Sequence, residues 1–130
     1  MAFMYQFTRF FQLRRKMMQI LMLRINPIKF ALYGIKLGKQ PRICNHVYLH
    51  VHPKSSVTIG DSFTMTSGEN FNPLCRNIKG TIYAEREDTV IKIGNHVGMS
   101  STCLWVKREI IIDDHVNIGG DCIIMDSDAH

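Results

Sequence analysis

The stretch IKIGNHVGMSSTCLWVKREIIIDDHVNIGGDCIIM, residues 91–125, decides the fold because it places an apolar residue at every sixth position, with one extra residue after Met99. A small, apolar companion follows four positions later, and an earlier stretch from Val47 has the same rhythm. The six-step positions are Val47, Pro53, Ile59, Ile93, Met99, Val106, Ile112, Ile118 and Ile124, and their companions are Val51, Val57, Phe63, Val97, Cys103, Ile110, Val116 and Cys122. The next companion position holds Asp128, so the rhythm ends there.

A period of six predicts an all-β fold, a parallel β-helix built from hexapeptide repeats. About three hexapeptides close one coil, and the six-step residue points inward at each corner. Gly60, Gly94 and Gly119 directly follow six-step positions, so we expect positive φ angles at these corners. Asp113 holds the same place after Ile112 and tolerates that geometry. The alternative is an ordinary alternating sheet, but chance alternation would not keep this phase through so many units.

Charge divides the chain into two segments. The first acidic residue is Asp61, and the remainder of the chain has six bases against eleven acids. Ten bases precede Asp61: Arg9, Arg14, Arg15, Lys16, Arg24, Lys29, Lys36, Lys39, Arg42 and Lys54. We therefore expect a basic helical segment over residues 1–42 and a hexapeptide-repeat domain over residues 43–130.

The N-terminal segment has the pattern of a basic amphipathic helix. Its apolar residues at helical spacing are Phe3, Phe7, Phe10, Phe11, Met17, Met18, Leu21 and Ile25. Asn26-Pro27 should stop or kink this helix. Interrupting bases exclude a secretory signal and a membrane span. Two roles stay open, a peripheral position on an anionic membrane surface and a cover over the first coil or between protomers. No recognition motif supports nucleic-acid binding.

Composition is that of one globular domain, with 130 residues, 45% hydrophobic and 21% charged. The four cysteines Cys44, Cys75, Cys103 and Cys122 form no C-x-x-C pair, which argues against a zinc finger or a redox motif. Reduced thiols in a cytoplasmic protein are the simplest interpretation. Cys103 and Cys122 fall on companion positions and are predicted to be core residues.

Turn-forming residues interrupt the rhythm between the two repeat stretches, which predicts an inserted loop at about residues 66–88. Residues 81–84 and 89–91 flank an acidic turn and are expected to form a short hairpin. Loops carried by a repeat scaffold often hold recognition residues. Candidate contacts to a polar substrate are Glu69, Asn70, Asn72 and Arg76, although a solvated loop is an equal alternative.

The repeats at residues 93–97 and 112–119, together with the closing Asp126-Ser127-Asp128-Ala129-His130, resemble the hexapeptide-repeat acyltransferases, close to the galactoside, maltose and capsular-sugar O-acetyltransferases. The resemblance covers about residues 47–130. It implies a left-handed parallel β-helix, a homotrimer, and acetyl-CoA bound between neighbouring protomers as acyl donor. It also implies that His130 is the catalytic base and that a hydroxyl of a sugar or glycan precursor is the acceptor, as in polysaccharide biosynthesis at the cytoplasmic membrane face.

Imidazole suits that role because it titrates close to neutral pH. We expect His130 to take the acceptor proton and Asp128 or Asp126 to fix its tautomer. Relatives place an acceptor-binding asparagine in the preceding coil, where this chain has Ser100-Ser101-Thr102, so Thr102 is a candidate contact. Trp105 could present a flat surface to a sugar ring, with core or interface packing as the alternative.

No metal site is expected. Carbonic anhydrases of the γ class share the implied fold and bind zinc through three histidines, but the spacing of His46, His50, His52, His96 and His115 does not match theirs. Family members continue past the terminal histidine with further coils, so we expect this sequence to be C-terminally truncated relative to them. A non-catalytic trimeric β-helical scaffold is therefore the alternative to an acetyltransferase.

Overall fold

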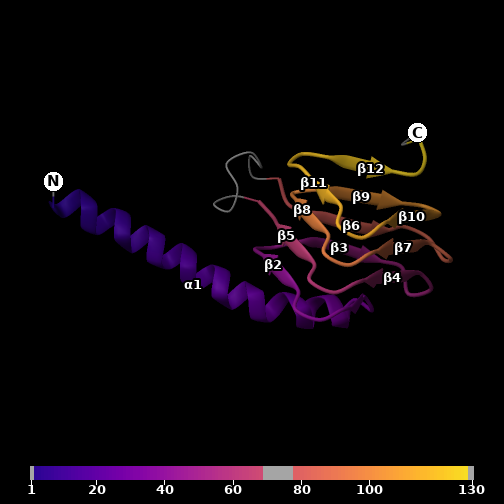
Figure 1. Cartoon of the computed structure of the whole chain (residues 1–130), viewed down its shortest axis with the longest axis horizontal. Coiled ribbons are helices and arrows are strands. Elements are labelled where there is room, and N and C mark those ends of the chain that lie inside the picture. The colour runs from indigo at the N-terminus through magenta and orange to yellow at the C-terminus, as the bar shows by residue number, and fades with distance from the viewer. Residues whose placement is uncertain (1, 69–77, 129–130) are drawn as a thin grey trace.

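The chain forms a stack of short strands with a long helix at its first coil (Figure 1). The computed structural model describes residues 2–68 and 78–128. Helix α1 spans Ala2–Leu32. The strands are β1 (Lys36–Leu37), β2 (Arg42–Cys44), β3 (Tyr48–Val51), β4 (Ser56–Ile59), β5 (Thr64–Thr66), β6 (Thr81–Ala84), β7 (Val90–Ile93), β8 (Gly98–Ser100), β9 (Cys103–Val106), β10 (Glu109–Ile112), β11 (Asn117–Ile118) and β12 (Ile123–Met125). The strands begin at Lys36, so the first coil starts before the boundary expected at residue 42.

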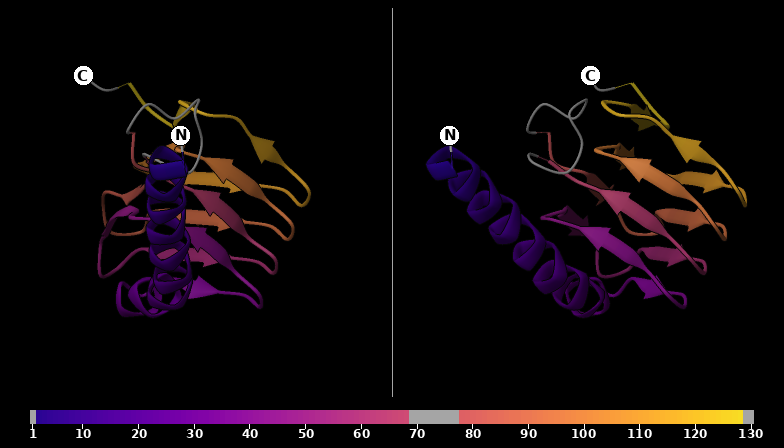
Figure 2. Two further views of the ribbon diagram at one scale, coloured as in Figure 1. Left: turned by 90° about the vertical axis from the view of Figure 1, so that its left-hand side faces the viewer. Right: turned by 60° about the vertical axis from the view of Figure 1, so that its left-hand side comes forward.

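The strands belong to three parallel sheets, and each sheet takes one strand from every coil. Their orders are β1-β4-β7-β10 in the first sheet, β2-β5-β8-β11 in the second and β3-β6-β9-β12 in the third. The pairing is in register, so that Thr58, Lys92 and Ile111 lie in one column. The chain visits the three sheets in turn, and successive coils stack on one another (Figure 2). This is the arrangement of a parallel β-helix, as the six-residue period predicts, with an N-terminal helix added.

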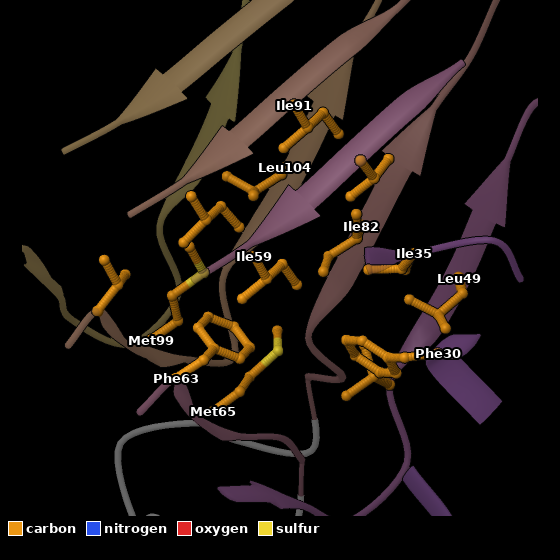
Figure 3. Close-up of a cluster of buried hydrophobic side chains, with 14 of the residues drawn as sticks. Phe30, Ile35, Leu49, Ile59, Phe63, Met65, Ile82, Ile91, Met99 and Leu104 are labelled. Carbon is orange, nitrogen blue, oxygen red and sulfur yellow. The ribbon is translucent and has the colours of Figure 1, made fainter. Parts of the chain in front are cut away.

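The core lies inside the coils and consists of the inward residues of all three sheets (Figure 3). Ile59 and Ile93 are paired neighbours in the first sheet, and Ile82 and Leu104 are paired neighbours in the third; all four are buried. Pro53 is an exception to the predicted pattern, because it lies exposed in the turn between β3 and β4. Cys103 and Cys122, which the pattern predicts to be core residues, are only half-buried.

The corners between the first and second sheets correct our explanation of the glycines. Positive φ angles occur here at Ser62, His96 and His115, and not at Gly60 or Gly94. Gly119, at the corner between the second and third sheets, has no positive φ either. At Gly60 and Gly94 the reason for glycine is space. A Cβ on Gly94 would overlap the Asp114 carboxylate and lie 2.7 Å from the Asp114 backbone nitrogen. The expectation of positive φ at Asp113 is likewise wrong.

A ladder of Asp and Asn side chains fills the space that these glycines leave. Asp61 Oδ1 accepts a 2.8 Å hydrogen bond from the backbone N–H of Lys39. Asn95 Oδ1 accepts one of 2.8 Å from Asp61 N–H, and Asp114 Oδ1 accepts one of 2.7 Å from Asn95 N–H. Each coil therefore supplies the acceptor for an otherwise unpaired corner amide in the coil below it.

The last third of α1 covers the open end of the first coil, as one of the two predicted roles requires. Met22, Asn26 and Phe30 recur every fourth residue and are buried, and Phe30 joins the core (Figure 3). Asn26 Nδ2 donates to the carbonyl oxygens of Ile43 (2.8 Å) and Asn45 (2.9 Å), which satisfies acceptors at this exposed edge.

Pro27 lies inside α1, so the helix does not stop at Asn26-Pro27; the predicted alternative, a kink there, stays a prediction. A proline in a helix interior costs about 3 kcal/mol, and the packing of Asn26 and Phe30 onto the first coil offsets this cost. The helix ends instead in a Schellman motif around Gly34, which has a φ of 84°. Gly34 N–H donates to Ala31 and Ile35 N–H donates to Phe30, both at 3.0 Å.

The predicted loop at residues 66–88 is shorter than expected, because the coil resumes at β6. This strand pairs with β3 below and β9 above, whereas β7 pairs with β4 and β10. The predicted hairpin between residues 81–84 and 89–91 is therefore wrong. A tight corner joins the two strands, and in it the buried Thr89 hydroxyl accepts from Arg86 N–H and donates to the Lys107 carbonyl.

Candidate functional site

The segment in which the repeat ends follows β12 at the corner between the third and first sheets. Asp126 is the first residue of this segment, and both of its carboxylate oxygens are occupied. Oδ1 accepts a hydrogen bond from Lys107 N–H (2.8 Å), and Oδ2 accepts from Arg108 N–H (2.6 Å) and Glu109 N–H (2.9 Å). These amides form the turn between β9 and β10 in the coil below, so Asp126 fixes the start of the segment to the body of the β-helix.

The electrostatics of Asp126 follow from these bonds. Burial alone would raise the pKa of this carboxyl, but the backbone N–H groups of Lys107, Arg108 and Glu109 stabilise its charged form and hold the pKa below the ordinary value. Asp126 therefore stays ionised near neutral pH. Because its oxygens already have three donors, we interpret it as a residue that positions the segment and not as the partner of a catalytic histidine.

Asp128 lies two residues further on and is exposed. His130, the predicted base, lies outside the described residues, as do the predicted substrate contacts Asn70, Asn72 and Arg76, together with Glu69. Their predicted roles stay predictions.

A row of aromatic side chains crosses the outer face of the third sheet. The row consists of Tyr48, His50, Tyr83 and Trp105. The rings of His50 and Tyr83 stack with centroids 4.3 Å apart, and Tyr83 meets Trp105 edge to face at 6.2 Å. His50, Tyr83 and Trp105 share one column, because each is the third residue of its strand and the strands pair in register.

Charged groups border the Trp105 end of the aromatic row. The indole Nε1–H donates to Glu85 Oε2, and Lys107 Nζ lies 5.7 Å from the centre of the indole ring. Flat aromatic faces with polar groups at their edge are suited to contact a ligand that has both apolar and hydroxyl-bearing surfaces, as a sugar ring does.

The aromatic row leads directly to the segment that begins at Asp126. Trp105 pairs with Met125 in the register of β9 and β12, and Asp126 is the next residue in the chain. The structure thus brings Trp105, Glu85 and the Asp126 segment to one corner of the β-helix. Sequence analysis proposed Trp105 but missed Tyr48, His50, Tyr83 and Glu85. Their shared strand position is the signal that could have found the rings, once the coil boundaries were known.

Thr102 does not belong to this surface, and its prediction as a substrate contact is wrong. Its side chain is fully buried, and its backbone carbonyl accepts a 2.9 Å hydrogen bond from Thr81 N–H. The neighbouring Ser101 is also buried, and its hydroxyl accepts from Gly68 N–H at 3.1 Å. Both residues stabilise the corner through Gly68 and Thr81.

The remaining histidines and cysteines have structural positions. His96 and His115 stack in parallel at 4.9 Å on the corner that carries the Asp and Asn ladder. Burial raises the pKa of the Cys103 thiol, which disfavours the reactive thiolate. Across residues 2–68 and 78–128, no group of three His, Cys, Asp or Glu side chains is arranged to hold a metal ion.

Comparison with known proteins identifies no relative. No family model matches this chain, and no curated protein or solved structure matches it with significance. The function is therefore inferred from the geometry of this corner and from the repeat motif.

Proposed function

We propose that this protein is an acyltransferase that moves an acetyl group from acetyl-CoA to a hydroxyl of a sugar or glycan precursor. The proposal includes a left-handed winding of the β-helix and a homotrimer whose neighbouring protomers share the donor site, as the hexapeptide-repeat resemblance implies. One observation carries it. The hexapeptide rhythm breaks into Asp-x-Asp-x-His at the corner where the aromatic row ends, and Asp126 anchors that segment.

The proposed mechanism assigns a separate role to each group. An imidazole nitrogen of His130 accepts the hydroxyl proton while the acceptor oxygen attacks the thioester carbonyl. The C–S bond then breaks, and the imidazolium returns the proton to the sulfur of the departing CoA. Transfer is direct, with no acyl-enzyme. Asp128 orients the imidazole through the other ring nitrogen and stabilises its positive charge.

Asp126 has a different role in this mechanism, because its oxygens are bonded to the Lys107–Glu109 turn. It positions the backbone that carries Asp128 and His130. The aromatic row supplies the acceptor subsite, with the indole of Trp105 against the apolar face of the sugar and the carboxylate of Glu85 near its hydroxyls.

The test measures release of the CoA thiol from acetyl-CoA in the presence of a panel of mono- and oligosaccharides. His130→Asn should lower kcat by about 10²- to 10⁴-fold, the usual contribution of a general base. His115→Asn is the matched control, because it makes the same change at an exposed histidine on another corner, where asparagine tolerates the positive φ. Its kcat should stay at the level of the unmodified protein.

Equal activity of the two variants would contradict the role of His130. If the unmodified protein neither releases thiol nor binds acetyl-CoA in calorimetry, the acyltransferase proposal fails and the non-catalytic scaffold becomes the better interpretation.

A further inference from the structure

Helix α1 carries a continuous apolar stripe that nothing in the described chain covers. Phe3, Phe10 and Met17 are 70%, 62% and 63% exposed, far above the values of core residues. The stripe consists of Phe3, Phe7, Phe10, Met17, Leu21, Ile25, Ile28 and Leu32, and all of these side chains are exposed. Large apolar residues exposed singly are ordinary, but a contiguous stripe of them marks an interaction surface.

The stripe faces away from the protein's own β-helix. At 100° per residue, Phe10, Met17 and Ile28 lie roughly 160–200° around the helix from Asn26. Asn26 is fixed to the first coil through its hydrogen bonds to Ile43 and Asn45, so α1 cannot rotate to bury the stripe. Further out, the side of the helix that Asn26 shares carries Thr8, Gln12 and Gln19 beside the exposed Met4 and Phe11.

The first two thirds of α1 extend beyond the coils (Figures 1 and 2). A helix gains most of its stability in a protein by burying an apolar face. Residues 2–18 have no buried side chain, so this part of α1 lacks such a partner within the described chain.

Charge identifies the kind of partner that fits. Helix α1 contains six bases (Arg9, Arg14, Arg15, Lys16, Arg24 and Lys29) and no acidic residue. A second α1 packed along the stripe would bring the same charge, with no carboxylate on either helix to neutralise it. Outside the N-terminal region, the exposed Tyr48, Ile123 and Met125 lie on the outer face of the third sheet together with the aromatic row, whereas Ile78 and Ile111 lie elsewhere in the described chain.

We infer that α1 binds an anionic lipid surface. The stripe lies at the boundary between headgroups and acyl chains, while the bases contact lipid phosphates. Arg14 lies within the stripe and Arg24 borders it, and both are long enough to reach the headgroups while their methylene stems cover apolar surface. No helix of the described residues has the length and apolarity to cross a bilayer, in keeping with a helix that lies along the surface. This inference does not depend on the proposed enzymatic activity.

The test is flotation of the full chain with two kinds of vesicle, pure phosphatidylcholine and phosphatidylcholine mixed with phosphatidylglycerol. We expect binding to the anionic vesicles, weaker binding to the neutral ones, and loss of the difference at about 1 M salt, where charges more than about 3 Å apart are screened. Binding to neither kind of vesicle would overturn the inference.

Two sets of variants separate the stripe from general effects on the helix. Phe7→Ser, Phe10→Ser and Met17→Ser together should lower the partition coefficient by at least about tenfold, because each removes apolar area from the lipid boundary. The matched control places three serines on the other side, at Tyr5, Thr8 and Gln12, and should leave binding within about twofold. The helix content of both variants is compared by circular dichroism.

A second variant keeps the test valid if the serines reduce helicity. Arg14→Gln with Arg24→Gln preserves helix propensity and should remove the preference for anionic vesicles. Equal binding by all variants would overturn the inference. It would also be overturned if the stripe variants lowered the oligomeric state in sedimentation while the unmodified chain bound no vesicle, because a second copy would then be the partner.

Discussion

Replacing Gly94 with alanine is expected to lower the free energy of unfolding by about 2–5 kcal/mol. A Cβ at this position would lie 2.7 Å from the backbone nitrogen of Asp114 and 2.9 Å from the backbone carbon of Asp113. These backbone atoms cannot rotate away, so the overpacking costs about 1–3 kcal/mol. The Cβ would also displace the Asp114 carboxylate and break its 2.7 Å bond from Asn95 N–H. Such a bond contributes about 1–2 kcal/mol at an exposed corner.

The measurement is thermal unfolding followed by circular dichroism. A loss of this size should lower the Tm by about 6–25 °C for a domain of this length. Gly119→Ala is the matched control, because among the described residues no atom beyond its chain neighbours lies within 4 Å of its added Cβ and its φ is not in the left-handed region. It should be neutral or stabilising by up to about 1 kcal/mol.

The combined variant Gly94→Ala with Asp114→Ala tests which contact matters. It should not recover stability, since the backbone overlap remains after the carboxylate is removed. An equal Tm for Gly94→Ala and Gly119→Ala would refute the explanation that the corner glycines provide space for the coil above.

Three further outcomes are expected. Backbone hydrogen bonds lower the pKa of Asp126 against the opposing effect of burial. The stability that they contribute is present above the pKa of the unfolded carboxyl and is lost as the pH falls through the folded pKa. Asp126→Asn should therefore reduce the loss of unfolding free energy at acid pH, measured by urea unfolding at a series of pH values. Asn26→Ala removes two hydrogen bonds and should cost about 2–3 kcal/mol in urea unfolding, whereas the exposed Gln12→Ala should change stability by less than about 0.5 kcal/mol. Trp105 is the only tryptophan, so a glycan acceptor should alter the tryptophan fluorescence of the protein. Glu85→Ala should shift the fluorescence of the protein without acceptor. Unchanged fluorescence in both measurements would place the acceptor elsewhere.

Sequence periodicity predicted the coils well because each strand depends mainly on its own alternation of inward and outward residues. Ile59, Ile93 and Ile112 could be assigned to the interior without knowing their neighbours. The explanation of Gly94 failed because its reason lies in Asp114, 20 residues further along the chain and one coil higher. A contact of that kind cannot be read from local φ preferences.

Two errors have the same origin. The helix-breaking tendency of Pro27 is a local property, whereas the packing of Phe30 against the core is a tertiary one. The hairpin expected before Thr89 followed local turn composition, whereas the strands pair between coils.

The candidate site could be predicted only in part. Asp126 was predicted because it begins the segment in which the repeat ends. Trp105 was predicted because its flat ring can contact a sugar. The aromatic row escaped notice because His50, Tyr83 and Trp105 are 33 and 22 residues apart in the sequence, and residues 69–77 disturb the phase between the first two. Thr102 was misassigned because position in a motif does not reveal burial.

The ladder of Asp and Asn side chains also sets an order for biosynthesis. The acceptors for the corner amides of Lys39, Asp61 and Asn95 come from residues 22, 34 and 19 positions later in the chain. During translation, a newly made coil therefore presents an incomplete corner until the following coil has left the ribosome. Maturation proceeds from the helix-covered end upward, and a ribosome that pauses between coils holds a nascent chain whose uppermost corner stays open to solvent and to chaperones.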